Sequence, residues 1–483
     1  TYPDGLDVEV FSFKLLKVYS AKNNKKSDLD CILIYGAGQA GREILGVLQQ
    51  NSNNHVVGFV DDNKDIQGRS QNNLNIYSPD EISNLIVKNG VTRIILAIPS
   101  IQKQRKNEII NSQLIHNIPV NTLPNLNKII SKEYNSTDIL NLKIEDLLGR
   151  EPIIADKKLL SKNITGKIVL VTGAGGSIGS ELSRQIIRLK PKKLILLDHS
   201  EFSLFSIFSE LKLKNSNITK KNNIVPIIGN INFKYEIDRI IKNEKPFTIY
   251  HAAAYKHVDI VEKNILAGIR NNIFGTLNVI KSSINNNVKN FIFISTDKAV
   301  RPTNIMGASK RVGELILQAL ANKNNNIKIS IVRFGNVLGS SGSVVPIFKN
   351  QIKMGGPVTV SHKEVERYFM TIPEATELVI QASSLSQESG SIFYLDMGEP
   401  VKIIDLAKKM INLSGHLVVT DNRKVLNGIK IVFTGLKVGE KMFEEFIIDG
   451  ISTSTDHPRI FSVKENFLEW SVLNEIVKII ELD

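Results

Sequence analysis

The chain is poor in the residues that build covalent or metal-bound frameworks. Among its 483 residues there is one cysteine, Cys31, in an apolar run. A single thiol excludes an internal disulfide framework and a cysteine-based zinc site. The histidines and carboxylates show no metal-ligand spacing, so we predict no metal site. No Ser-His-Asp arrangement for hydrolysis is indicated.

Long apolar runs are also missing. No stretch of about eighteen apolar residues occurs, so no segment is expected to span a membrane, and no secretory signal pattern is visible. Charged residues make up 23% of the chain and hydrophobic residues 42%, which is ordinary for a soluble globular protein. The length allows two or three domains with cores of their own.

Positive charge is in excess but is not gathered into a stripe. The formal net charge is +13, and lysines are scattered among asparagines, as in Lys323–Asn326. No basic patch with interleaved aromatic residues and no matching motif occurs, so we expect no nucleic-acid partner. A mild positive field still helps to attract an anionic small molecule.

A dinucleotide-binding pattern begins at residue 168. The apolar run Ile168–Val171 predicts a buried parallel strand, and Gly173, Gly176 and Gly179 follow before a helical segment. Glycine permits the tight turn and the close backbone approach to a pyrophosphate. Asp198 ends the next strand, where a carboxylate accepts hydrogen bonds from ribose hydroxyls and repels a 2′-phosphate. The ordered pattern predicts NAD rather than NADP.

A second pattern of the same kind lies near the N-terminus. Strand Cys31–Tyr35 enters Gly36, Gly38 and Gly41, and Asp61 lies twenty residues after Gly41. One interpretation is a second nucleotide site at Gly36, Gly38, Gly41 and Asp61. The other is a Rossmann-like domain that has lost its ligand and packs or regulates, because fold does not determine function.

Residues 295–310 carry a group of side chains suited to chemistry. A strand-like run leads into Ser295 and Thr296, and Lys310 is the fourth residue after Met306. Many nucleotide-sugar enzymes have Ser/Thr followed by Tyr-x-x-x-Lys here, and the tyrosine takes a proton from a sugar hydroxyl. Met306 occupies the tyrosine's place, and a thioether has no proton to exchange. Another group is therefore expected to carry that proton.

Asp297 and Lys298 directly follow the Ser-Thr pair. An adjacent carboxyl and amine suit acid and base roles in the elimination of water. The alternative is an ordinary Asp-Lys pair in a loop, since a motif match by itself is a hypothesis.

Taken together, these segments resemble the long-form bacterial nucleotide-sugar 4,6-dehydratases of polysaccharide biosynthesis, within the extended short-chain dehydrogenase/reductases. Methionine in place of tyrosine is a mark of this long form. The resemblance runs from about residue 166 to 460 and rests on TGAGGSIGSEL, LLDHSEF, HAAAYKHVDIVE, NNIFGTLNV, STDKAVRPTNIMGASKR, VRFGNVLGSSGSVVPIF, RYFMTIPEA, GLKVGEK and HPRI.

The resemblance implies a reaction and a set of roles. NAD takes a hydride from C4 of UDP-N-acetylglucosamine, a base removes the C5 proton, and an acid protonates the leaving 6-hydroxyl. The hydride then returns to C6. Lys298 would be the base, in a neutral form favoured by burial near another cation. Asp297, through Thr296, would carry the C4-hydroxyl proton to the departing oxygen, and Lys310 would bind the nicotinamide ribose.

The resemblance also implies binding residues. Those expected to contact NAD are Gly173, Gly176, Ser177, Ile178, Gly179, Asp198, Asn230, Ile231, Ala252, Ala253, Ala254, Asn272, Ser295 and Lys310. Those expected to contact the UDP-sugar are Tyr255, Lys256, Arg333, Asn336, Arg367 and Glu440. Two positions depart from the family pattern, because Asn230 stands where an aspartate is usual and Lys437-Val438 replaces Arg-Pro.

Two other functions compete with this interpretation. A UDP-sugar 4-epimerase also uses bound NAD, but epimerases generally need the tyrosine that Met306 replaces. A non-catalytic subunit that senses NAD or a UDP-sugar is disfavoured, since Thr296, Asp297, Lys298 and Lys310 are all present.

The predicted fold class is α/β, with two Rossmann-like doubly wound parallel-sheet domains, the second carrying a small α/β substrate-binding part. We expect an irregular segment at residues 1–29, an N-terminal nucleotide-binding domain at 30–124, a connector at 125–165 and the catalytic domain at 166–483. We expect a homo-oligomer. The family usually carries membrane helices before its first domain. We therefore expect a cytoplasmic chain, held at the inner membrane when such helices are present.

Overall fold

The computed structural model describes residues 30–50, 53–98, 155–214, 224–385, 388–419, 428–448 and 451–482, with residues 105, 108, 109, 112, 118 and 120–122. The chain divides into two compact units, residues 1–149 with 408–430 and residues 150–407 with 431–483. The predicted segment 1–29 and most of the predicted connector 125–165 lie outside the described residues. The domain boundaries stay predictions.

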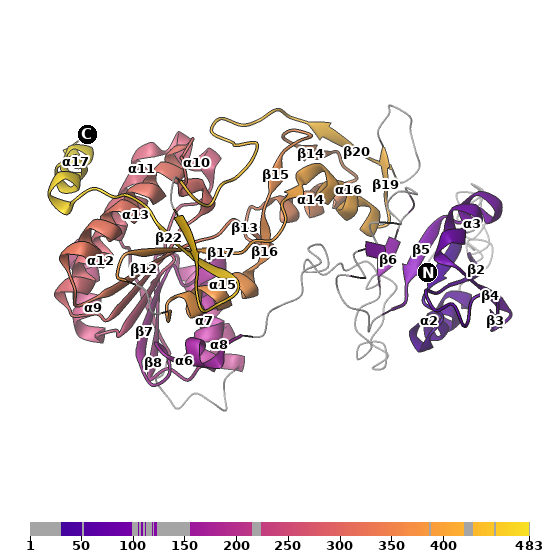
Figure 1. The fold of residues 1–483 in the computed structure, drawn as a ribbon, viewed down its shortest axis with the longest axis horizontal. Coiled ribbons are helices and arrows are strands. Elements are labelled where there is room, and N and C mark those ends of the chain that lie inside the picture. The colour runs from indigo at the N-terminus through magenta and orange to yellow at the C-terminus, as the bar shows by residue number, and fades with distance from the viewer. Residues whose placement is uncertain are drawn as a thin grey trace, which may run out of the picture. The chain divides into compact units, whose positions relative to one another are not determined.

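The N-terminal unit contains a six-stranded sheet (Figure 1). Its order is β3-β4-β2-β1-β5-β6, and all neighbours are parallel except the antiparallel pair β3 and β4. Apolar side chains of β1 and β2 pack against the buried face of α2. The elements are β1 (Asp30–Tyr35), α2 (Gln39–Gln49), β2 (Asn54–Val60), β3 (Ser70–Gln71), β4 (Leu74–Tyr77), η1 (Pro79–Glu81), α3 (Ile82–Asn89), β5 (Arg93–Leu96) and β6 (Val120–Thr122).

The second unit is built on a nine-stranded sheet of order β21-β22-β17-β12-β11-β10-β7-β8-β9. The strands from β17 to β9 are all parallel, and β22 and β21 add an antiparallel edge. The strands are β7 (Ile168–Thr172), β8 (Lys193–Asp198), β9 (Ile224–Ile228), β10 (Thr248–His251), β11 (Asn290–Ile294), β12 (Lys328–Arg333), β17 (Ser391–Leu395), β21 (Ile451–Ser454) and β22 (Ile460–Lys464).

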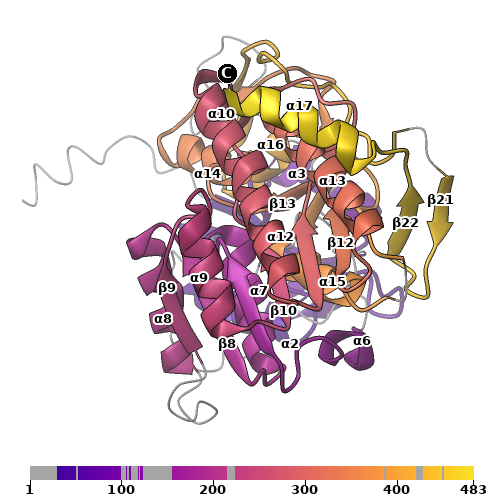
Figure 2. The ribbon, with the colours of Figure 1, turned by 90° about the vertical axis from the view of Figure 1, so that its left-hand side faces the viewer.

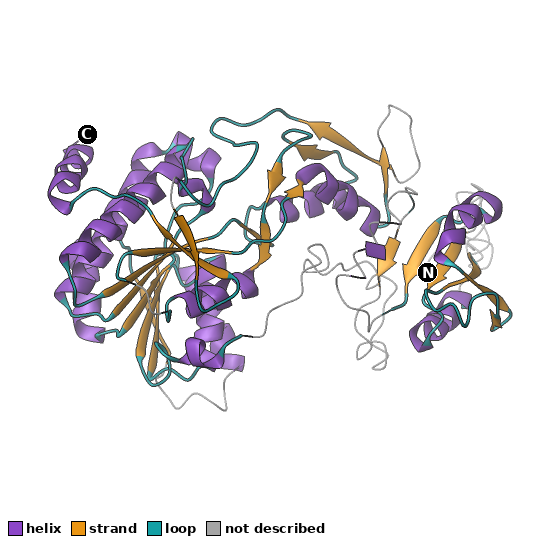
Figure 3. Cartoon of the chain, in the orientation of Figure 1, coloured by secondary structure: helices purple, strands orange, loops and turns teal. Residues whose placement is uncertain are grey.

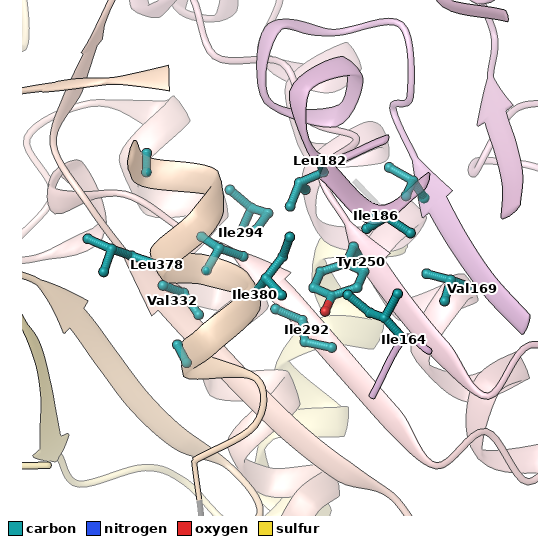
Figure 4. Close-up of a cluster of buried hydrophobic side chains, with 14 of the residues drawn as sticks. Ile164, Val169, Leu182, Ile186, Tyr250, Ile292, Ile294, Val332, Leu378 and Ile380 are labelled. Carbon is teal, nitrogen blue, oxygen red and sulfur yellow. The ribbon is translucent and has the colours of Figure 1, made fainter. Parts of the chain in front are cut away.

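Helices cover both faces of this sheet (Figure 2). One face packs on α6 (Lys157–Ser161), α7 (Ser177–Arg188), α8 (Glu201–Lys214) and α15 (Ile372–Ala382), and Figure 4 shows this core around Tyr250. The other face packs on α9 (Lys234–Glu244), η4 (Arg270–Gly275), α12 (Thr276–Asn285), α13 (Ile305–Lys323) and α17 (Trp470–Leu482). Neighbouring strand residues such as Val169 and Leu170 belong to opposite cores, as the two-residue period of a strand requires.

Short elements follow β12 (Figure 3). Here β13 pairs with β16, β14 pairs with β20, and β15 pairs with β18. The elements not yet placed are α10 (Val258–Lys263), α11 (Ile265–Ile269), η5 (Asp297–Ala299), β13 (Asn336–Leu338), α14 (Val344–Lys353), β14 (Val358–Val360), β15 (Glu366–Arg367), β16 (Phe369–Thr371), β18 (Val401–Lys402), α16 (Ile403–Leu413), β19 (Leu417–Val419) and β20 (Gly428–Phe433).

The prediction of an α/β protein with a parallel Rossmann-like sheet and a separate N-terminal α/β domain is confirmed. The parallel order places β7 beside β10, so the strand order reverses there. Open α/β sheets bind ligands at the carboxyl ends of the strands at such a point. Within the described residues, no helix is both long and apolar enough to cross a bilayer.

Candidate active site

The turn between β7 and α7 leaves no room for side chains. Gly173 has a φ of 67°, and a Cβ there would lie 2.7 Å from the backbone nitrogen of Ala253. A Cβ on Gly179 would lie 2.0 Å from the carbonyl oxygen of Gly173. Gly176 begins α7 without a side-chain cap, an arrangement that leaves the helix N–H groups to an anion. The turn has the form of a pyrophosphate cradle.

Asp198 closes this turn from the end of β8. Its Oδ2 accepts a hydrogen bond from the N–H of Gly175 at 2.9 Å, and its Oδ1 accepts one from the N–H of Ser200 at 2.9 Å. The carboxylate is buried and held beside the glycines. Ribose recognition by Asp198, which the sequence predicts, fits this position and stays a prediction.

A cleft of about 630 Å³ is lined by the glycine turn and by the end of β11. This volume lies within the range of pockets for small molecules and cofactors. The structure brings many of the predicted site residues together on its walls: Gly176, Ser177, Ile178, Gly179, Ala252, Ala254, Tyr255, Lys256, Ser295, Thr296, Lys298, Met306, Lys310 and Asn336.

The short helix η5 presents the predicted acid and base. Thr296 donates a hydrogen bond from Oγ1 to Oδ1 of Asp297 at 2.8 Å, and Nζ of Lys298 donates to the same oxygen at 3.1 Å. Asp297 is 1% exposed, and its Oδ2 has no donor among the described residues when the nearby Glu444 is ionised, whereas a protonated Glu444 can hydrogen-bond to Asp297. A buried carboxylate oxygen without a partner is costly, which is typical of a functional group.

Glu444 completes this cluster, although no sequence motif predicts its place there. Its Oε1 accepts a hydrogen bond from Nζ of Lys298 at 2.7 Å, and its Oε2 accepts one from Nδ2 of Asn336 at 3.1 Å. Oδ1 of Asn336 in turn accepts from Nζ of Lys298 at 3.2 Å. Glu444 lies 146 positions from Lys298 along the chain. Its nearness to the Gly439-Glu440-Lys441 segment is the one available sequence signal.

The charges of this cluster bear on the role expected of Lys298. Burial alone would lower the pKa of Lys298, but Asp297 and Glu444 raise that pKa above its ordinary value. Burial would raise the pKa of Asp297, yet the Lys298 ammonium and the hydrogen bonds hold it below its ordinary value. Burial and the charge of Asp297 raise the pKa of Glu444 to about 8. Two carboxyl groups contact the Lys298 ammonium and favour its charged form, so the neutral amine that the base role needs stays a prediction.

Met306 and Lys310 lie one turn apart on α13, and both are buried. Nζ of Lys310 lies 3.7 Å from the centroid of the Phe293 ring. Burial lowers the pKa of Lys310 to about 7. An anionic or hydroxyl-bearing ligand in the cleft would therefore stabilise the charged form of Lys310.

A second cavity of about 210 Å³ shares one lining residue, Lys298, with the cleft. Arg367 and Glu440, both predicted to bind substrate, line this second cavity and are brought together there. Nη2 of Arg367 lies 3.1 Å from Oε1 of Glu440, and Nε of Arg367 lies 3.3 Å from Oε1 of Glu444. The Arg367 guanidinium is thus paired with the carboxylates of both Glu440 and Glu444.

Arg333 does not have the place that the sequence predicts. Its side chain is fully buried and forms two-pronged hydrogen bonds to Glu314 and to Glu465 at 2.7–2.8 Å. A ligand in either cavity cannot reach a guanidinium enclosed in this way. The prediction of a substrate contact is corrected, because the two buried carboxylates bind Arg333 inside the protein.

Two predicted cofactor residues also have their polar groups engaged internally. Ser295 lines the cleft, but its hydroxyl donates to Oε1 of Glu314 at 2.6 Å. Asn272 is buried, and its amide accepts from the N–H of Tyr255 at 2.8 Å and donates to the Tyr255 carbonyl at 3.0 Å. Asn272 therefore acts on the cleft by holding the backbone of Tyr255.

Residues at the end of β9 lie outside the walls described above. Asn230 accepts a hydrogen bond from the N–H of Asn232 at 3.0 Å, and Ile231 is buried in the core. Their contact with the cofactor stays a prediction. By contrast, Tyr255 and Lys256 lie on the cleft wall; Tyr255 is 40% exposed, and burial lowers the pKa of Lys256.

The glycine turn of the N-terminal unit resembles the turn between β7 and α7 in its geometry. Gly36 has a φ of 110°, and a Cβ on Gly41 would lie 2.0 Å from the carbonyl oxygen of Gly36. Gly38 begins α2 without a side-chain cap, and Oδ2 of Asp61 accepts a hydrogen bond from the N–H of Ala37 at 2.8 Å. The N-terminal unit thus has the form of a nucleotide-binding turn, and the binding of a nucleotide there stays a prediction.

Comparison with known proteins gives two family matches. Residues 169–465 match the family described as "Polysaccharide biosynthesis protein", and residues 29–115 match the family described as "C2185-like, N-terminal". "Capsular polysaccharide biosynthesis protein CapD" of Staphylococcus aureus is 44% identical over 419 residues, which cover 86% of this chain and 68% of that protein.

Relatives whose names state an activity are more distant. A "UDP-N-acetylglucosamine 4,6-dehydratase (inverting)" of Campylobacter jejuni is 30% identical over 58% of this chain and 78% of that protein. A "UDP-glucose 4-epimerase" of Rickettsia akari is 32% identical over 58% of this chain and 77% of that protein. Overall identity therefore does not separate the two activities.

The crystal structure titled "X-ray structure of Pen from Bacillus thuringiensis" is 30% identical and has a TM-score of 0.55, covering 66% of this chain and 99% of that one. This likeness agrees with the parallel sheet and the glycine turn described above. The family match spans more than half of the chain. The chain therefore belongs to the polysaccharide biosynthesis proteins of the extended short-chain dehydrogenase/reductase superfamily.

Proposed function

We propose that this protein is an NAD-dependent UDP-N-acetylglucosamine 4,6-dehydratase that makes a UDP-4-keto-6-deoxy-N-acetylhexosamine for a surface polysaccharide or glycan. The observation that carries the proposal is the cluster at the cleft wall. Thr296, Asp297 and Lys298 lie in hydrogen-bond contact, while Met306 stands where a proton-carrying tyrosine is usual. Such an arrangement suits the removal of water and not simple oxidation at one carbon.

The residues around the glycine turn fit NAD. A Cβ at Gly173 or Gly179 would meet backbone atoms, so the turn is open to a pyrophosphate and closed to a side chain. Asp198 would accept hydrogen bonds from the adenine ribose, and Lys310 would hold the nicotinamide ribose. Bound NAD would supply the centre that accepts a hydride from the sugar and returns it.

Side chains of the protein would carry out the proton transfers. Thr296 lies on the cleft wall and donates to Asp297, so the proton of the C4 hydroxyl can pass to Asp297 through it. Lys298, once it has lost a proton, would remove the proton at C5, which the C4 ketone has made acidic. Asp297 would then give its proton to the oxygen leaving C6. The net change is a ketone at C4, a methyl group at C6 and one released water.

The UDP part of the substrate would lie toward Arg367 and Glu440. The Arg367 guanidinium is already paired with Glu440 and Glu444, so a diphosphate there would have to replace one of these carboxylates. Lys437 and Lys441 line the same cavity and add positive charge to it. The sugar would then reach Lys298 from the side on which Tyr255 and Lys256 lie.

A 4-epimerase is the second candidate, supported by the relatives of that name. An epimerase oxidises and reduces C4 alone and has no use for a base at C5. Incubation of the protein with UDP-N-acetylglucosamine, followed by NMR, separates the candidates. A dehydratase yields a 4-keto-6-deoxy sugar, an epimerase yields the galacto isomer, and a sensing subunit yields neither. The galacto isomer as the sole product would refute the proposal.

A further inference from the structure

This inference rests on the proposed function, in which Lys298 is the base that removes the C5 proton. The contacts of Lys298 make that role difficult. A base must have an open lone pair, yet Nζ of Lys298 lies 3.1 Å from Oδ1 of Asp297 and 2.7 Å from Oε1 of Glu444. Both contacts favour the ammonium, which has no lone pair to offer. The lysine must therefore lose a proton to a neighbour before it can take one from a sugar.

Glu444 is the neighbour placed to receive it. Oε1 of Glu444 is the carboxylate oxygen nearest to Nζ, while Oδ1 of Asp297 also accepts from Thr296. The Glu444 side chain is 3% exposed, so water reaches it little. Asn336 donates to its other oxygen, Oε2, at 3.1 Å, which leaves Oε1 directed at the lysine.

We propose that Glu444 accepts a proton from Lys298 and thereby creates the neutral amine that removes the C5 proton of the bound sugar. The N–H bond of the ammonium breaks as the O–H bond of the Glu444 acid forms. The amine lone pair then takes the C5 proton, and the C–H electron pair moves into the enolate of the C4 ketone. When Lys298 returns its proton to C5, Glu444 returns the first proton to Lys298, so both groups regain their starting state.

The electrostatics of the pocket agree with this order. The groups facing Glu444 are Asp297, Lys298, Arg367 and Tyr368, together with the neutral Asn336. Burial and the Asp297 charge raise the pKa of Glu444 to about 8, so its acid form is accessible at neutral pH. Burial would also raise the pKa of Asp297, but the Lys298 ammonium and the hydrogen bonds to Asp297 hold that pKa below its ordinary value. Of the two carboxyl groups, Glu444 is therefore the one that holds a proton more readily.

Glu444 acts on the sugar through Lys298, so its test must separate proton transfer from a merely structural role. Glu444→Gln keeps the size of the side chain and one acceptor oxygen but cannot take up a proton. The probe is UDP-N-acetylglucosamine in D2O, with NADH absorbance reporting oxidation at C4 and deuterium at C5 reporting the base. We expect C4 oxidation within about tenfold of wild type and a C5 exchange rate at least about 100-fold lower.

The pH dependence gives a second readout. In wild type, Glu444 must be ionised to receive the proton, so C5 exchange should increase as pH rises toward 8 and then level off. Glu444→Gln should lose this limb, and its residual exchange should keep increasing at higher pH as free hydroxide removes the Lys298 proton. The control is Glu445→Gln, because Glu445 is an exposed neighbour that pairs with Arg301 and Lys441. It should behave as wild type.

Three outcomes would overturn the inference. Exchange by Glu444→Gln near the wild-type rate would do so, as would an equal loss of C4 oxidation and C5 exchange, which indicates a structural role. If Glu444→Gln does not fold, a wild-type exchange rate that is flat between about pH 6 and 8 is the contradicting result. Wild-type protein that makes no keto sugar would instead refute the proposed function.

Discussion

The hydroxyl of Thr296 donates a 2.8 Å hydrogen bond to Oδ1 of Asp297, while Thr296 itself lies on the wall of the large cleft. A buried carboxylate is thereby connected to the cleft through one hydroxyl group. Met306, on the same wall, offers no exchangeable proton. The route of the C4-hydroxyl proton can thus be tested with two substitutions of matched size.

Met306→Leu should cost little and Asp297→Asn should cost much. Leucine removes no ionisable group, so we expect at most about a tenfold loss of turnover, or about 1.4 kcal/mol of barrier. Asparagine keeps the shape of Asp297 but removes the acid, and general acid–base roles are worth roughly 100- to 10,000-fold. The measurement is turnover of UDP-N-acetylglucosamine by each variant. An inactive Met306→Leu beside a nearly normal Asp297→Asn would show that the proton takes another route, for example through Tyr255.

Lys298→Ala should abolish the product and keep the cofactor. The base serves the C5 step, whereas the glycine turn and Asp198 belong to other elements, so cofactor binding should survive. The variant should therefore still accumulate NADH when the sugar is added but release no 4-keto-6-deoxy product. Product formation at a substantial fraction of the wild-type rate would remove Lys298 from the mechanism.

Cofactor released from the purified protein should be NAD. The Asp198 carboxylate is held beside the glycine turn by two backbone N–H groups, and its negative charge would repel a 2′-phosphate. Mass spectrometry of the released cofactor is the measurement. Mainly NADP would contradict the role given to Asp198.

Removal of one carboxylate from the buried network around Arg333 should destabilise the protein strongly. Glu465→Gln would leave Arg333 and Arg311 short of one carboxylate in a site where Arg333 is fully buried. Breaking a buried ion pair typically costs about 3–5 kcal/mol, which the free energy of unfolding in urea would report. Lys464→Gln is the control, since its side chain is 91% exposed and should change stability by about 0.5 kcal/mol or less. Equal stability of the two variants would contradict the role of the network.

Local patterns made the fold and the glycine turns predictable. The strand, the glycines and Asp198 follow one another within about thirty residues, so their spacing carries the turn geometry. The cluster around Lys298 depends on tertiary packing instead. Glu444 comes from a segment 146 positions away, and no local pattern shows that its carboxylate reaches the lysine.

Tertiary contacts also explain where the structure departs from the expectations drawn from sequence. Arg333 has the residue type of a diphosphate ligand, but Glu465 reaches it from beyond β22 and encloses it. A neighbouring cation was expected to favour the neutral form of Lys298, whereas two carboxyl groups raise its pKa and favour the charged form. The side-chain amide of Asn272, which was expected to contact the cofactor, is bonded to the backbone of Tyr255. For Lys298 and Arg333, one partner lies far away in the sequence: Glu444 is 146 positions from Lys298, and Glu465 is 132 positions from Arg333.

The configuration at C5 should be retained in the product. Lys298 is the proposed carrier of the C5 proton, and Met306 has none to give, so the proton should return to the face from which it left. The coupling constants of the product's ring protons report this configuration. An inverted product would mean that a second donor acts from the opposite face.

The most direct test of the central claim is incubation of the wild-type protein with UDP-N-acetylglucosamine in D2O, followed by mass spectrometry and NMR. We expect a product that has lost one water, carries a ketone at C4 and has gained deuterium at C5. A sugar of unchanged composition with an inverted C4 and no deuterium at C5 would contradict it and would identify an epimerase.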